Sequence, residues 1–301
     1  MNTTRREFLT VTAGLGALSA LGCSGLGSAA RSPFEISLAE WSLHRALYGN
    51  QMTNLDFPSV ARRDYDIGVV EYVNSFFKDK ARDERYLGEL LARCRDAGVA
   101  NRLIMIDGEG ELAHADDAER RKAVLNHQRW VDCAALLGCM AIRVNAAGSG
   151  DPGEMQRRAA DSLVQLANYG NDKKIAVIVE NHGGWSSNGE WLAGVMKLAA
   201  DPRVGTLPDF GNFNLGGGKT YDRYQGIAEM MPFAKAVSAK SHEFDERGEE
   251  VHTDYHRMLR IVTQAGYHEH VGIEYEGEKH SEFEGIRLTK ALLEKVRAEL
   301  A

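Results

Sequence analysis

Short apolar segments alternate with longer amphipathic stretches along the whole chain after residue 33. The segment "IAVIVEN" at residues 175–181 is typical, because a run of mostly β-branched residues ends abruptly at Glu180. Runs of this kind are typical of parallel strands that are buried on both faces. Eight such strands are predicted, and they begin near Phe34, Gly68, Arg102, Met140, Ile175, Val204, Ala236 and Val271.

The spacing between the predicted strands runs from 29 to 38 residues, which leaves room for one helix in each interval. Stretches such as "DERYLGELLARCRDAG" place apolar residues three and four positions apart, as amphipathic helices do. Eight strand-then-helix units predict a (β/α)8 TIM barrel that forms a single domain over residues 31–301. The alternative is a doubly wound open sheet, which is disfavoured because no glycine-rich phosphate fingerprint follows the first strand.

The first 30 residues have the pattern of an export signal. The stretch "TTRREFL" is a twin-arginine motif, and a Gly/Ala-rich apolar segment follows it from Val11 to Leu26. The sequence therefore predicts a twin-arginine signal peptide over residues 1–30 and a periplasmic protein with no membrane span after processing. Cys23 follows "SALG", a loose lipobox, so anchoring through a lipid on Cys23 is the alternative.

Charge and cysteine content narrow the classes of partner. The chain has a formal net charge of -7, which argues against a nucleic-acid partner. Three cysteines follow the signal, Cys94, Cys133 and Cys139, with no Cys-x-x-Cys spacing among them. This argues against a disulfide framework and against a thiolate zinc site, so we expect buried, unpaired cysteines.

The chemistry of a barrel of this type lies at the carboxyl ends of its strands, and here every apolar run ends on polar residues. The fifth to eighth runs end on Glu180, Asp209, His242 and Glu274. Neighbouring strands lie about 4.8 Å apart, so these four side chains are expected to converge. Three carboxylates that close repel one another unless a cation lies among them. The set predicts one divalent metal ion, with manganese, magnesium or cobalt favoured and zinc as the alternative; unrelated salt bridges are the competing interpretation.

The segments "VIVENHGG", "LPDFGNF", "AKSHEFDERG" and "GIEYEG", in this order, resemble the xylose isomerase-like TIM barrels of the sugar phosphate isomerase/epimerase type. The resemblance covers residues 34–298, and it implies that Glu180 and Glu274 bind the metal and also shuttle the proton. The sequence departs from the family pattern at Asn212, where those epimerases usually carry histidine. Lys240 and His242 point the same way by the two-residue period of a strand, so either can occupy the seventh-strand ligand position.

The resemblance and the strand-end residues together predict a metal-dependent sugar isomerase or epimerase that acts through an enediolate. Glu180 and Glu274 are expected to exchange the proton on opposite faces of a small carbohydrate. The residues expected to contact the substrate are His182, Lys240, Arg143, Trp41, His44 and Asn212. Two alternatives stay open: a 3-keto-glycoside 1,2-lyase that uses the same metal site, and a non-catalytic exported sugar-binding barrel. The glycine-rich stretch at residues 213–224 is predicted to be a mobile loop over the site, and the oligomeric state is left open.

Overall fold

A computed structural model describes residues 32–301 of the chain; the predicted signal peptide, with Cys23, lies outside the described residues. All eight predicted strands are present, and their bounds agree with the expected positions to within a few residues. The strands of the main sheet are β1 (Glu35–Ala39), β2 (Val69–Val73), β3 (Ala100–Met105), β4 (Ala141–Val144), β5 (Ala176–Glu180), β6 (Val204–Leu207), β9 (Val237–Ser241) and β10 (His270–Tyr275).

The strands are parallel and close into a barrel. Their order is β6-β5-β4-β3-β2-β1-β10-β9, so each strand pairs with its neighbour in sequence and β1 pairs with β10. The seam between β6 and β9 is closed by two parallel bridges, Thr206 with Ala234 and Asp209 with Ser238. The predicted (β/α)8 barrel is therefore confirmed.

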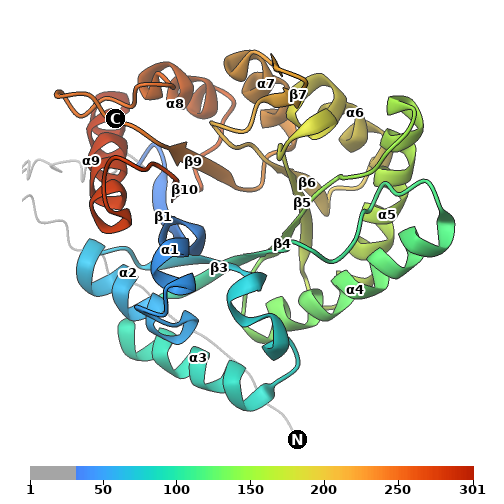
Figure 1. Cartoon of the computed structure of the whole chain (residues 1–301), viewed down its shortest axis with the longest axis horizontal. Helices are drawn as coiled ribbons and strands as arrows, with labels where there is room; N and C mark the ends of the chain where they lie inside the picture. The colour runs from blue at the N-terminus through green and yellow to red at the C-terminus, as the bar shows by residue number, and fades with distance from the viewer. Residues whose placement is uncertain (1–31) are drawn as a thin grey trace, which may run out of the picture. The chain divides into compact units, whose positions relative to one another are not determined.

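The helices form a ring outside the strands (Figure 1). They are α1 (His44–Tyr48), α2 (Phe57–Tyr65), α3 (Glu84–Ala97), α4 (Asp117–Leu136), α5 (Pro152–Gly170), α6 (Gly189–Ala199), α7 (Arg223–Met230), α8 (Tyr255–Gln264) and α9 (Glu282–Leu300). Short 3-10 segments cover residues 40–43, 54–56, 74–80, 184–187 and 231–233. Most of the long helices begin after a side-chain cap: Asp151, for example, accepts a hydrogen bond from the backbone N–H of Glu154 at 3.0 Å.

The barrel has two apolar regions, one between the sheet and the helices and a smaller one inside the strands. The smaller region includes Leu103, Met105, Ile178 and Leu207, all with no exposed surface. Because side chains fill the interior in this way, the barrel is a packed core and not a pore. Polar side chains gather at the carboxyl ends of the strands, and this is where the candidate site lies.

One local prediction is wrong. Residues 214–220 lie within the stretch expected to be a loop, but they form a short antiparallel hairpin of β7 (Asn214–Gly216) and β8 (Lys219–Thr220). Gly217 and Gly218 make its turn with φ of 58° and 76°. Glycine adopts these positive φ angles without steric cost, which is why a tight turn forms here.

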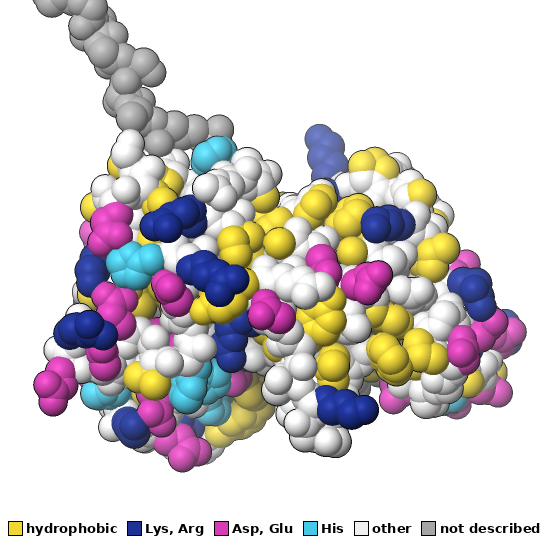
Figure 2. Space-filling view, turned by 90° about the horizontal axis from the view of Figure 1, so that it is seen from above, with side chains coloured by type: hydrophobic (Ala, Val, Ile, Leu, Met, Phe, Trp, Pro, Cys, Tyr) yellow, Lys and Arg dark blue, Asp and Glu magenta, His cyan; other side chains and the backbone are white. Residues whose placement is uncertain are grey.

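The molecular surface mixes charges of both signs. On the face drawn in Figure 2, basic and acidic side chains are interspersed. Within residues 32–301, no helix combines the length and the apolar character that crossing a bilayer requires. The three cysteines of this part of the chain are buried and unpaired, as predicted.

Candidate active site

Three carboxylates converge at the carboxyl end of the barrel. Glu180 ends β5, Asp209 follows β6 by two residues, and Glu274 is the penultimate residue of β10. Each offers an oxygen within 4.8 Å of the others, and none of the three side chains is more than 3% exposed. The sheet places them together because the carboxyl ends of neighbouring parallel strands meet at one end of the barrel.

The two carboxylate oxygens of Asp209 differ in their surroundings. Its Oδ1 accepts hydrogen bonds from the N–H groups of Gly211 and Asn212, both at 2.8 Å. The side chain of Asn181 holds the backbone of Asp209 through two hydrogen bonds, of 2.7 and 3.0 Å. The second oxygen, Oδ2, is buried and has no hydrogen-bond partner among the described residues. Burial raises the pKa of Asp209 to about 7, against the opposing effect of the Lys240 charge.

Glu180 has one neutral and one charged partner. Its Oε1 accepts a hydrogen bond from the side-chain amide of Asn212 at 2.9 Å, and its Oε2 lies 2.7 Å from Nε of Arg143. Arg143 is 4% exposed and also pairs with Asp107 at 2.9 Å. Burial raises the pKa of Glu180 to about 7, and the charge of Arg143 works in the opposite direction.

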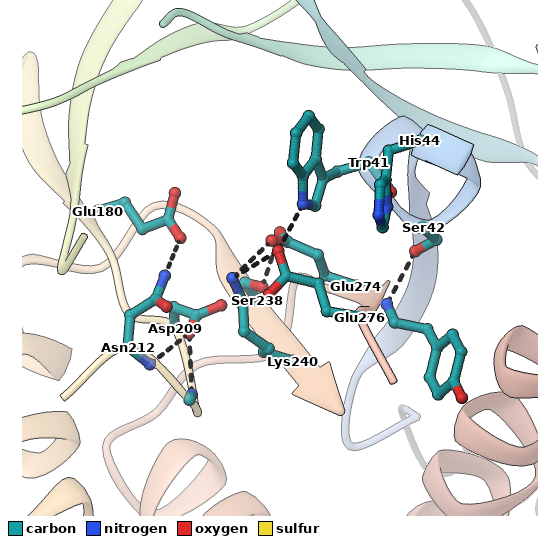
Figure 3. Close-up of polar contacts among 12 residues, drawn as sticks. Trp41, Ser42, His44, Glu180, Asp209, Asn212, Ser238, Lys240, Glu274 and Glu276 are labelled. Carbon is teal, nitrogen blue, oxygen red and sulfur yellow. Dashed lines mark hydrogen bonds and ion pairs between the residues drawn. The ribbon is translucent and has the colours of Figure 1, made fainter. Parts of the chain in front are cut away.

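Lys240 lies among the carboxylates (Figure 3). It stands opposite Glu274 in the register of β9 and β10, and its Nζ is 2.9 Å from Glu274 Oε1 and 3.3 Å from Glu276 Oε1. Burial by itself lowers the pKa of Lys240, but the charges of Asp209, Glu274 and Glu276 outweigh burial and hold this pKa well above its ordinary value. Lys240 is therefore a buried ammonium ion.

The structure places Lys240, and not His242, beside the three carboxylates. The His242 side chain is 37% exposed, and its Nε2 lies 3.8 Å from Glu276 Oε2. Its ring lies 6.0 Å from that of His252. By the two-residue alternation of a strand, His242 would point to the same side as Lys240. Strand β9 ends at Ser241, one residue before His242, so this alternation does not extend to His242.

A cavity of about 430 Å³ opens onto this cluster, and several expected substrate contacts line it: Trp41, Arg143 and His182, together with Asp107, Glu274 and Glu276. The indole N–H of Trp41 donates to Glu276 Oε1. Trp41 is also stacked on His44 at 4.8 Å between ring centroids. His44 itself turns toward Glu282, 3.3 Å away, so it supports the tryptophan and does not line the cavity. Asn212 reaches Glu180 instead of the cavity.

Three residues of the site were not predicted from the sequence: Glu276, Asn181 and Gly211. Glu276 was visible as a polar residue after a strand, but its pairing with Lys240 depends on the register of β9 against β10. Asn181 follows Glu180 directly in the chain, and its side chain acts through the backbone of Asp209. Nothing in the sequence marks Gly211 as a neighbour of Lys240.

The residues present fit a divalent ion in part. Glu180, Asp209 and Glu274 supply the carboxylate oxygens that hard cations prefer, and the unpartnered Oδ2 of Asp209 is available as a ligand. The ammonium of Lys240 is a second positive charge at the same carboxylates. An ion held there has to coexist with this ammonium or displace it.

The chain belongs to the xylose isomerase-like TIM barrel family, whose model matches residues 61–298. No curated protein matches the chain. The family match covers all the strand-end residues described above except those that follow β1.

Solved structures with the same fold include sugar epimerases. A xylose isomerase-like TIM barrel protein from Mycobacterium smegmatis in complex with magnesium is 14% identical, with 89% of this chain and 98% of that chain covered and a TM-score of 0.68. D-psicose 3-epimerase with D-tagatose from Clostridium cellulolyticum H10 is 11% identical, with 88% and 99% covered and a TM-score of 0.64. The 3-keto-D-glucoside 4-epimerase from E. coli is 13% identical, with 87% and 99% covered and a TM-score of 0.63. At these identities the likeness shows the fold.

Proposed function

We propose that the protein is a sugar isomerase or epimerase that moves a proton at a carbon next to a carbonyl group. The observation that carries this proposal is a pair of buried carboxylates, each with a cation beside it: Glu274 on β10 lines the cavity, and Glu180 on β5 lies behind Arg143, which also lines it. Two carboxyl groups next to one cavity supply the acid/base pair that the removal and return of a proton on two faces of a sugar requires. The family and the epimerases of the same fold agree with this class of reaction.

In this proposal Glu180 and Glu274 take and return the proton. Arg143 and Lys240 lie beside them and stabilise the negative charge that develops on the sugar oxygens. Trp41 lines the cavity with a flat apolar ring, which suits the C–H face of a sugar. Asp209 accepts two backbone hydrogen bonds, so it stays in place while the other groups exchange protons.

A divalent ion belongs to the proposal as the cofactor, with manganese, magnesium or cobalt favoured. Glu180, Asp209 and Glu274 would hold it. When bound, such an ion polarises a carbonyl and stabilises an enediolate. The magnesium complex of the Mycobacterium smegmatis relative supports the choice of an oxygen-liganded metal.

Solvent-deuterium exchange tests the acid/base roles. In deuterated buffer with manganese and a ketohexose, the wild-type protein is expected to incorporate deuterium next to the carbonyl. We expect Glu180→Gln and Glu274→Gln each to lower this rate by about 100-fold or more, since general acid-base catalysis contributes 10²–10⁴-fold. Glu119→Gln, an exposed glutamate on α4, is the control and should exchange like the wild type. Normal exchange in either site variant would remove that residue from the role.

A second candidate is a 3-keto-glycoside 1,2-lyase, in which the same deprotonation is followed by loss of the group at the anomeric carbon. A specific observation favours a glycoside: a cavity of about 520 Å³ adjoins the site and shares Tyr48, Ser75 and Lys78 with it, which gives room for a second ring. Incubation with a 3-keto-glucoside separates the two, because elimination releases the aglycone and epimerisation does not. A sugar-binding barrel without catalysis would bind the sugar and exchange no deuterium.

We also propose that the substrate is an unphosphorylated sugar met after export. The twin-arginine motif at Arg5 and Arg6 supports this location, with lipid attachment at Cys23 as its variant. Phosphorylated sugars are scarce outside the cytoplasm, so a free keto-sugar or keto-glycoside suits a periplasmic enzyme better. Fractionation of cells, followed by detection of the processed chain, tests the proposal, since a purely cytoplasmic chain would contradict it.

A further inference from the structure

The side chain of Lys240 is built into the carboxylate cluster by its strand register. Lys240 is the fourth residue of β9 and pairs with Glu274 of β10, so the two side chains leave the sheet on the same side. The hydroxyl of Tyr255 donates to the carbonyl oxygens of Ala239 and Lys240, at 2.9 and 3.0 Å, which fixes the strand at this point. The position of the ammonium therefore follows from the sheet and not from a flexible surface contact.

The neighbouring backbone leaves a slot for the lysine stem. A Cβ atom at Gly211 would lie 2.9 Å from Cδ and 3.0 Å from Cγ of Lys240, closer than carbon atoms pack. Glycine at position 211 thus allows the long side chain to pass between the β6–β7 connection and β9. A shorter side chain at position 240 would not need this space.

The ammonium of Lys240 uses an oxygen that a metal ion would need. Lys240 holds Oε1 of Glu274, and the hydroxyl of Ser238 donates to Oε2 of the same carboxylate at 3.2 Å. Both oxygens of Glu274 are therefore engaged within the chain. A divalent ion bonded to Glu274 would also lie next to the ammonium, and like charges at such a distance repel strongly in a buried site.

No histidine compensates for this arrangement within residues 32–301. His242 is the nearest candidate in sequence, but its side chain lies with Glu276 and His252 at a more exposed position. The positive charge that the three carboxylates require is already supplied by the chain itself.

We propose that Lys240 is a resident cation of the carboxylate cluster and that it competes with a divalent ion for Glu274. Lys240 keeps the cluster folded and charge-balanced without a metal ion. A divalent ion binds only when it displaces the ammonium, so its affinity is low. This inference rests on the proposed function for the position of the ion, and it concerns the residue that sets the ion's affinity.

Binding of manganese to wild-type and Lys240→Met protein tests the proposal without any sugar. Methionine has a similar length and no charge, so it fits the slot beside Gly211. Isothermal titration calorimetry should show that Lys240→Met binds Mn²⁺ at least ten-fold more tightly than the wild type. Lys122→Met removes one exposed positive charge on α4, far along the chain from the cluster, and should bind like the wild type.

Thermal unfolding provides a second measurement. Without metal, Lys240→Met is expected to unfold at a lower temperature than the wild type, because the buried carboxylate of Glu274 has lost its cation. Mn²⁺ should then raise the melting temperature of Lys240→Met by more than it raises that of the wild type. Equal or tighter binding of Mn²⁺ by the wild type would overturn the proposal. If Lys240→Met does not fold, Lys240→Gln takes its place in both measurements. A Kd of the wild-type protein for Mn²⁺ in the low micromolar range would overturn the proposal without any variant.

The sugar experiment and the metal experiment can fail separately. Absence of deuterium exchange in the wild type would count against the isomerase proposal and leave the competition between Lys240 and Mn²⁺ intact. Tight Mn²⁺ binding by the wild type, together with normal exchange, would count against the role of Lys240 alone.

Discussion

Asn212 is the residue that connects two of the three carboxylates. Its side-chain amide donates to Glu180 Oε1 at 2.9 Å, and its backbone N–H donates to Asp209 Oδ1 at 2.8 Å. Its carbonyl oxygen accepts hydrogen bonds from Asn181 and Ser187. The hydrogen bonds of the Asn212 backbone do not depend on its side chain. A substitution of Asn212 therefore tests only the side-chain contact with Glu180.

We expect Asn212→Ala to lower the rate of deuterium exchange by about 10- to 100-fold. A hydrogen bond to a charged group contributes about 1.5–3 kcal/mol, and here it orients a buried carboxylate. Because Asn212 positions Glu180 and does not line the cavity, kcat should fall while KM changes little. Steady-state kinetics with a ketohexose measures both constants.

Asn126→Ala is the matched control for this prediction, since its side chain donates to the carbonyl oxygen of Glu109 at 3.1 Å, outside the site. An Asn212→Ala protein with the kinetics of the wild type would mean that the contact with Glu180 does not orient the carboxylate.

At the scale of elements, the attachment of α9 to β10 sets the position of Glu274. Gly285 lies in the first turns of α9, and a Cβ atom there would lie 2.2 Å from the ring of Tyr275, the residue after Glu274. The helix therefore approaches the strand as closely as its backbone allows. Gly88 in α3 is the contrasting case, because it is exposed and a Cβ atom there would meet nothing within 4 Å.

The same substitution is expected to have opposite effects in these two helices. Gly88→Ala should raise the free energy of unfolding by about 0.5–1 kcal/mol, because alanine loses less backbone entropy than glycine in a helix. Gly285→Ala should lower the free energy of unfolding by about 1–3 kcal/mol, because the added methyl group has no room. Urea denaturation followed by circular dichroism measures both. A Gly285→Ala protein as stable as Gly88→Ala would show that α9 can move away from β10 at no cost.

At the scale of the whole molecule, the barrel could be predicted from the sequence, but the polar site at the carboxyl ends of its strands could be predicted only in part. Eight apolar runs with helix-sized intervals specify the fold because parallel strands are buried on both faces. The choice between Lys240 and His242 was not predictable, since both share one face by the period of a strand and only the end of β9 at Ser241 separates them. The hairpin at residues 214–220 was missed because glycines mark a turn without saying whether strands flank it.

The burial of Glu40 is another feature that the sequence did not reveal. Glu40 follows β1, where a solvent-exposed polar residue would look the same, but it has no exposed surface. Its oxygens accept hydrogen bonds from Asn54 at 2.8 Å and from the backbone N–H of Val73 at 3.0 Å. Burial raises the pKa of Glu40 to about 8, although both hydrogen bonds act in the opposite direction.

This raised pKa predicts how the stability of the barrel depends on pH. In the unfolded chain the pKa of Glu40 has its ordinary value of 4.5, so between about pH 4.5 and pH 8 the folded state holds a proton that the unfolded state has lost. The contribution of Glu40 to the free energy of unfolding is therefore complete below pH 4.5 and falls as the pH rises toward 8. One proton corresponds to a slope of up to about 1.4 kcal/mol per pH unit.

Glu40→Gln removes this titration, because glutamine stays neutral at every pH. We expect the free energy of unfolding of Glu40→Gln to fall less steeply between pH 5 and pH 8 than that of the wild type, by up to about 1.4 kcal/mol per pH unit. Urea denaturation at each whole pH unit in this range gives both slopes, and a constant offset from the altered hydrogen bonds does not affect their difference. Glu119→Gln on the exposed face of α4 should keep the wild-type slope. Parallel curves for Glu40→Gln and the wild type would mean that Glu40 is ionised in the folded barrel.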